Sequence, residues 1–135
     1  MTTNLYQGLK EAPVSIQIVP SGDYKSVDAA ISTIVCPDDA VGMKVDIDIT
    51  AASGGGGVTV TVSAYDPATN AYDVTLLVSA LKTGTGHTVL RIDPRIAASA
   101  NLIAQDGLPG SVQVKCVGSG TRTTLTYSVG VSFHQ

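Results

Sequence analysis

The chain has 135 residues, the usual length of one domain, and 44% of them are hydrophobic while only 14% are charged. The net charge is −3 and the few Lys and Arg residues are scattered, which argues against a nucleic-acid partner. No apolar run approaches the roughly 18 residues needed to span a bilayer, so no membrane partner is expected. Soluble chains usually carry about a quarter charged residues. Part of this surface is therefore expected to lie against other protein.

Residues 1–13 are predicted to form an N-terminal arm, and residues 14–135 a single domain. The arm is polar and has no sustained period, but apolar Leu5, Tyr6 and Leu9 interrupt it. These three side chains are the expected contacts with a neighbouring protein subunit; a loose tail is the alternative. The first residues lack the charged start and apolar run of a signal peptide, so synthesis in the cytoplasm is expected.

Strands in the first half are predicted from alternating apolar and polar residues. They are expected over residues 14–20, 27–36, 43–49 and 58–62, with a turn at Ser21-Gly22-Asp23.

The glycine run 54–57 separates the two segments of cleanest alternation, 43–49 and 58–62. A flexible loop between two such segments predicts a hairpin. Asp46 and Asp48 then face solvent, on the opposite side from the core. The core is expected to contain Val45, Ile47, Ile49, Val60, Leu125 and Val129.

In the second half, residues 66–70 (Asp-Pro-Ala-Thr-Asn) predict a turn, because Asp bonds the backbone ahead of it, Pro fixes φ and Asn tolerates the left-handed region. Alanines in residues 94–105 favour at most one or two helical turns there. Further strands are expected over residues 72–81, 88–93, 111–117 and 121–133. Many short alternating strands predict an all-β fold: an antiparallel β-sandwich or jelly-roll-like barrel with at most one short helix.

The sequence contains no recognisable catalytic constellation, so an enzyme is not expected. His87 follows a glycine-rich turn and His134 is the penultimate residue, and both are expected to be solvated. Asp46 and Asp48 lie on one strand face, where a cation or acid–base pair is the functional interpretation and a solvated charged face is the favoured one. Asp38-Asp39 predicts a turn rather than a calcium site.

No cofactor or metal site is predicted. The glycine run lacks the Lys-Ser/Thr of a phosphate-binding loop, and Cys36 and Cys116 lack the paired spacing of a zinc site. Both cysteines are expected to be free and buried, since a chain made in the cytosol seldom carries a disulfide. Tyr24, Tyr65 and Tyr72 could provide a sugar-binding aromatic platform, but no motif groups them.

Between Lys44 and Val131 the sequence contains the following segments in order: Val-Asp-Ile-Asp-Ile-Thr-Ala-Ala-Ser-Gly at 45–54, Val-Thr alternation at 58–62, Asp66-Pro67, Tyr72 ahead of Leu76-Leu77, Thr83-Gly84-Thr85-Gly86, Val89-Leu90-Arg91-Ile92 with Pro94, Leu108-Pro109, and Tyr127-Ser128-Val129-Gly130. In these segments the stretch from Lys44 to Val131 resembles a family of small virion proteins of tailed bacteriophages, which are head-decoration or related structural proteins. It departs after Leu108-Pro109, where relatives carry an aromatic-Arg pair and this chain has Gly110-Ser111.

This resemblance implies a capsid decoration (cement) protein. Such a protein is made in the bacterial host cytoplasm, binds the outside of the phage head and reinforces contacts of the major capsid protein. The implied partners are the major capsid protein and further copies of the chain itself, as a homotrimer. The alternatives are a tail or head–tail connector component and a carbohydrate-binding β-sandwich module.

Overall fold

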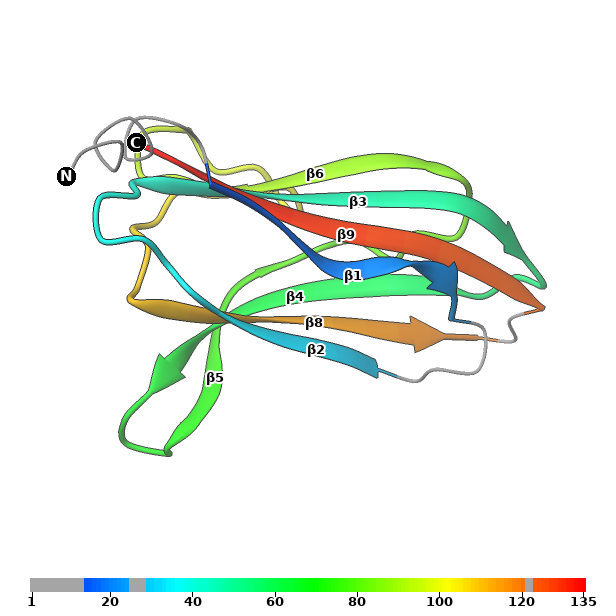
Figure 1. Ribbon diagram of the computed structural model, residues 1–135, viewed down its shortest axis with the longest axis horizontal. Coiled ribbons are helices and arrows are strands. Elements are labelled where there is room, and N and C mark those ends of the chain that lie inside the picture. The colour runs from blue at the N-terminus through cyan, green and yellow to red at the C-terminus, as the bar shows by residue number, and fades with distance from the viewer. Residues whose placement is uncertain (1–13, 25–28, 121–122) are drawn as a thin grey trace, which may run out of the picture.

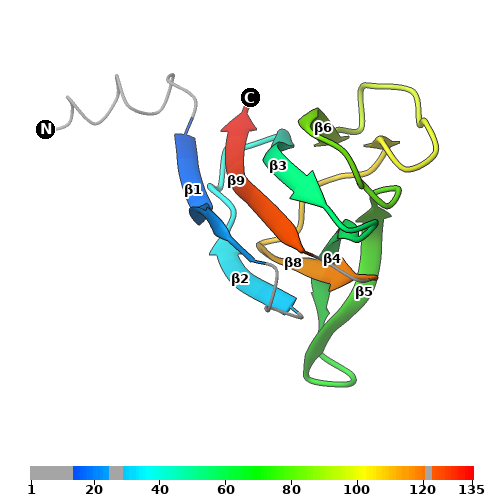
Figure 2. The same cartoon turned by 90° about the vertical axis from the view of Figure 1, so that its right-hand side faces the viewer.

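The computed structural model describes residues 14–24, 29–120 and 123–135. Within these residues, nine strands form two sheets that pack face to face as a β-sandwich (Figures 1 and 2). The all-β prediction is confirmed. The predicted arm, with Leu5, Tyr6 and Leu9, lies outside the described residues, so its predicted contacts stay predictions.

The larger sheet has five strands in the order β1-β9-β3-β6-β7. It contains β1 (Val14–Asp23), β9 (Thr124–His134), β3 (Gly42–Ser53), β6 (Gly86–Ile92) and the short β7 (Ile103–Ala104). All its pairs are antiparallel except β6–β7, which is parallel. β1 and β9, the first and last strands of the described residues, are therefore direct neighbours.

The smaller sheet has four strands in the order β2-β8-β4-β5, all antiparallel. It contains β2 (Ala29–Val35), β8 (Ser111–Ser119), β4 (Gly57–Asp66) and β5 (Ala71–Val78). Figure 1 shows the β4–β5 hairpin extending away from the body of the sandwich.

The core lies between the two sheets, where the inward residues of each strand meet. In β3 the inward side chains are at most 3% exposed, while Lys44, Asp46 and Asp48 between them face outward. Period-two alternation produces this arrangement because successive side chains of a strand point to opposite faces. The six predicted core residues are all buried in one cluster: Val45, Ile47, Ile49, Val60, Leu125 and Val129.

The predicted hairpin between residues 43–49 and 58–62 is wrong. β3 belongs to the five-stranded sheet and β4 to the four-stranded sheet, so the glycine run crosses from one layer to the other. Gly54 and Gly55 take φ values of 87° and 82°, which side chains rarely tolerate. Both strands alternate correctly because each has one face on the shared core, and that pattern cannot tell a hairpin from a crossing between layers.

Residues 94–105 contain no helix. The backbone of this segment instead bonds to β6: Arg91 N donates to Leu102 O at 2.9 Å, and Asp93 N donates to Ala104 O at 3.0 Å. Asn101 adopts φ 64° and its side-chain amide donates to Val78 O at 3.0 Å. Bonds to a neighbouring strand thus replace the helical bonds that the alanines favour.

Two turn predictions have opposite outcomes. The turn at Ser21-Gly22-Asp23 is wrong, because β1 continues through these residues with two irregularities in its pairing to β9. The turn over residues 66–70 is confirmed in its mechanism. Asp66 Oδ1 accepts a hydrogen bond from Ala68 N at 2.9 Å, and Asn70 has φ 56°. Local side-chain chemistry therefore predicted the turn that depends on it.

Candidate functional site

The outer side of the four-stranded sheet, here called the hydroxyl face, is rich in hydroxyl side chains and poor in charge over the described strands. Strand pairing aligns its outward residues in rows, such as Thr33–Gln113–Ser63–Thr75. The neighbouring row contains the one charge, Lys115, opposite Ile31 and Thr61. The hydroxyl face consists of Ala29, Ile31, Thr33, Val35, Thr59, Thr61, Ser63, Thr75, Val78, Ser111, Gln113, Lys115 and Val117.

Two tyrosines lie at one end of the hydroxyl face. Tyr65 and Tyr72 meet edge to face with ring centroids 5.3 Å apart. The Tyr72 hydroxyl lies 2.9 Å from Ser111 Oγ, and the Tyr65 hydroxyl donates to the Asn70 side-chain oxygen. The structure thus groups two residues that no motif had grouped. The signal was available, because both flank the turn that the sequence predicted.

Tyr24 does not join this pair. Its ring packs on Tyr127 at a centroid distance of 4.7 Å, and its hydroxyl donates to Pro20 O at 2.6 Å. Tyr24 therefore supports the core at the end of β1, and of the three candidate tyrosines only Tyr65 and Tyr72 lie together.

The outer side of the five-stranded sheet, here called the charged face, is hollowed at its centre. The hollow has a volume of about 560 Å³, and its lining includes Lys44, Asp46, Asp48, His87 and Gly130. A Cβ at position 130 would meet nothing closer than the Ile16 carbonyl oxygen at 3.7 Å, so the glycine leaves open space above the sheet.

Asp46 and Asp48 face outward from β3, as predicted. Asp46 Oδ1 lies 3.8 Å from Nε2 of His87, and both side chains are well exposed, at 44% and 64%. An exposed pair at this distance contributes little to stability. Across the described ranges, no group of three or more His, Cys, Asp or Glu side chains is placed to hold a metal ion.

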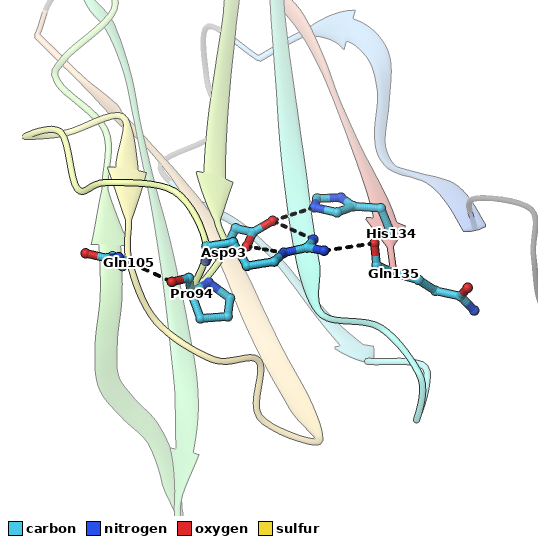
Figure 3. Close-up of polar contacts among 6 residues, drawn as sticks. Asp93, Pro94, Gln105, His134 and Gln135 are labelled. Atoms are coloured by element: carbon cyan, nitrogen blue, oxygen red, sulfur yellow. Dashed lines mark hydrogen bonds and ion pairs between the residues drawn. The ribbon is translucent and has the colours of Figure 1, made fainter.

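A polar cluster of Asp93, Arg95 and His134, in which the Asp93 side chain is buried, lies at the end of β6 and β9; Figure 3 labels Asp93 and His134. The Asp93 side chain is 2% exposed. Its Oδ2 accepts from Arg95 Nη2 at 3.0 Å and lies 2.9 Å from His134 Nε2, while its Oδ1 accepts from the backbone and Nε of Arg95 at 2.8 and 3.0 Å. The Asp93 cluster was missed by sequence analysis, which expected His134 to be solvated.

The hydrogen bond from the Arg95 side chain has the largest effect on the pKa of Asp93, and the one with His134 has the second largest. Together they hold this pKa well below its ordinary value of 3.8. The Asp93 carboxylate in turn raises the pKa of Arg95. Gly42 closes over the pair, since a Cβ there would collide with the His134 ring and lie 2.7 Å from Asp93 Oδ2. The Asp93 cluster therefore joins the end of β6 to the end of β9.

Cys36 and Cys116 are both free and buried, which confirms the prediction. Burial raises the pKa of both thiols, that of Cys116 to about 12. A thiol that stays protonated at neutral pH is a poor nucleophile and a poor metal ligand. The described part of the chain also contains no helix long and apolar enough to cross a membrane.

No protein-family model matches the chain, and no curated protein matches it. Solved structures with a similar fold include the VP2 subviral particle of infectious bursal disease virus, at 14% identity and a TM-score of 0.47 over 91% of this chain and 32% of that one. The cellulose-specific carbohydrate-binding module CBM28 aligns at 12% identity and a TM-score of 0.43 over 90% of this chain and 73% of that one. The empty cowpea mosaic virus particle aligns at 15% identity and a TM-score of 0.40, over 90% of this chain and 84% of that one. The chain spans about a third of the VP2 protein, and these similarities concern the sandwich fold alone.

Proposed function

We propose that this protein is a structural component of a phage virion, a decoration protein that binds the outside of the head and reinforces contacts of the major capsid protein. The sequence resemblance supports this proposal, and the hydroxyl face is the observation that carries it. A broad, regular sheet surface with one charge among thirteen residues costs little to remove from water, because few charges lose their hydration.

The composition of the hydroxyl face also suits a protein partner. Ile31 and Val35 are 55% and 78% exposed and gain from burial. The Thr, Ser and Gln side chains can replace their hydrogen bonds to water with hydrogen bonds to a partner. We therefore assign the capsid contact to this face. The homotrimer expected from the resemblance stays a prediction.

A matched pair of variants tests this assignment. Thr61→Glu adds a carboxylate to the hydroxyl face beside Lys115, and Ser132→Glu adds one to the charged face beside Lys44. Each new charge has a lysine neighbour, so both variants should fold. Binding to undecorated heads should weaken about tenfold or more for Thr61→Glu and stay unchanged for Ser132→Glu. If Thr61→Glu and Ser132→Glu bind heads equally well, the hydroxyl face is not the capsid contact.

Position on the particle tests the function itself. A decoration protein occupies many sites over the head, whereas a tail or connector component forms a single ring of about six or twelve copies. Reconstruction of the intact particle should show density for this chain spread over the head. Density confined to the tail or portal would replace the decoration role by the connector alternative.

A second candidate is carbohydrate binding, favoured by the Tyr65–Tyr72 pair. The rings lie beside Ser111, whose hydroxyl already bonds Tyr72, and such a combination of aromatic surface and hydroxyls can bind sugars. Titration with soluble glucose oligosaccharides, followed by tyrosine fluorescence, should give saturable binding that Tyr65→Ala removes. Tyr24→Phe is the control, because Tyr24 lies apart from the pair.

A further inference from the structure

The four edge strands of the sandwich differ in how well they are protected against pairing with another chain. An exposed sheet edge is a template for a further strand, and proteins usually block it with bulges, Pro, charges or short length. β1 contains Pro20 and two irregularities in its pairing, β5 contains Asp73 and two irregularities, and β7 has only two residues.

β2 has none of these protections. Its sequence, Ala-Ala-Ile-Ser-Thr-Ile-Val, has no charge and no Pro, and its seven residues pair with β8 without a single irregularity. In the described ranges no strand pairs with its other side. The Ser32 hydroxyl donates to the Ile18 carbonyl at 3.2 Å, which ties β2 to β1 in the other layer (Figure 2). β2 is thus a regular edge held in place and open to a partner.

We propose that β2 pairs antiparallel with β2 of a second copy of this chain, around a twofold axis that passes midway between the two Thr33 residues. An axis perpendicular to the sheet keeps the hydroxyl face on the same side in both copies. Outward residues must then face outward residues. Those of β2 are Ala29, Ile31, Thr33 and Val35.

The exposed side chains of β2 select the register. With the axis at Thr33, each Thr33 faces the other, and Ile31 of each copy faces Val35 of the other copy. Thr–Thr pairs and pairs of branched apolar side chains are among those that stabilise sheets. Ile31 and Val35 are 55% and 78% exposed, so this register covers the apolar surface that one copy leaves open.

No charge repulsion opposes the pairing of two β2 strands, because β2 contains no charged residue. The two four-stranded sheets become one continuous sheet with eight strands, and the hydroxyl face doubles in length. This contact deepens the proposed function by giving the capsid-facing surface a twofold form. It differs from the threefold form that the resemblance implies, so the mass of the free assembly separates the two.

Charge reversal at the axis tests the contact in the free protein, without heads. Wild-type protein should shift from monomer to dimer in sedimentation runs between about 10 μM and 1 mM. Thr33→Glu and Thr33→Lys each place two like charges face to face and should weaken the dimer about tenfold or more. An equal mixture of the two variants should dimerise again, which an unfolded variant could not do. Thr61→Glu, on the inner strand β4, should dimerise like the wild type.

Crosslinking locates the axis. Thr33→Cys places two thiols on directly opposite residues, about 4.5–5.5 Å apart at Cβ, and a short thiol crosslinker should give a covalent dimer. Thr61→Cys and the wild type, whose two cysteines are buried, should remain single chains. A wild-type protein that stays monomeric at about 1 mM, that forms trimers, or that dimerises equally as Thr33→Glu would overturn the proposal. None of these outcomes bears on whether the hydroxyl face binds a head.

Discussion

The two outer faces of the sandwich are built alike and carry different chemistry. The charged face displays Lys44, Asp46, Asp48 and Arg91 on adjacent strands, whereas Lys115 is the one charge among the thirteen residues that define the hydroxyl face. Their inner faces are equally apolar and meet in one core. The fold constrains only the inner residues, so the outer residues are free to differ. This difference is the one that the proposed contact on the hydroxyl face requires, with the charged face left in water.

Truncation of the core should have the largest effect on stability. Ile47 is fully buried, and Ile47→Ala removes methyl groups and leaves a cavity, at a cost of about 2–5 kcal/mol of unfolding free energy. Val62→Ala, on the other sheet, should also be clearly destabilising because both sheets share the core. Thr59→Ala, on the hydroxyl face, should cost less than half as much as Ile47→Ala. Urea unfolding measures all three, and equal costs for Ile47 and Thr59 would contradict the assignment of inner and outer faces.

Removal of the buried charge should have an intermediate effect. Asp93→Ala leaves the backbone N–H and guanidinium of Arg95 without their acceptor, which should cost about 1–3 kcal/mol. The pKa of Asp93 is lowered by folding, so the carboxylate stabilises the fold above its unfolded value of 3.8. That stabilisation is lost as the pH falls below 3.8 toward the lower pKa of the folded state.

The gap in stability between wild type and Asp93→Ala should therefore be widest at neutral pH and shrink below pH 3.8. Asp48→Ala, an exposed carboxylate on the charged face, serves as the control and should show a small gap. Nearly all ordinary carboxylates are protonated at about pH 2. If the stability gap between wild type and Asp93→Ala does not change down to this pH, the charge of Asp93 does not stabilise the fold.

Neutralising the charged face should have the smallest effect. The double substitution Asp46→Asn and Asp48→Asn should change the unfolding free energy by less than about 0.5 kcal/mol, because the His87–Asp46 pair is exposed. It should also leave head binding unchanged if the contact is on the hydroxyl face. A loss of binding would assign a second contact to the charged face.

Local patterns in the sequence predicted the features that depend on neighbouring residues. Alternation over 43–49 gave the inner and outer faces of β3, and Asp66 with Asn70 gave the turn between β4 and β5. These succeed because pleating and turn geometry depend on residues a few positions apart. The Tyr65–Tyr72 pair is of the same kind, since the two tyrosines flank one predicted turn.

Features that depend on distant residues were missed. Alternation in β3 and β4 does not reveal that β3 pairs with β6 and β9, so the glycine run was assigned to a hairpin rather than a crossing. The Asp93–His134 contact joins residues 41 positions apart, and no local motif marks it. The alanines of residues 94–105 likewise favour a helix, but the backbone of this segment forms hydrogen bonds with the β6 region instead. In each case a partner elsewhere in the chain decided the outcome.

The place of β9 between β1 and β3 has a consequence for how the chain folds during synthesis. β1 pairs Val14 with Phe133, and β3 pairs Gly42 with His134, so the five-stranded sheet cannot form before β9 has been made. A ribosome-bound chain lacking β9 exposes the inner faces of β1 and β3 and cannot close the core. Folding therefore follows completion of β9, through contacts of long sequence separation that form slowly. Until then the exposed apolar strands of the nascent chain are prone to aggregate.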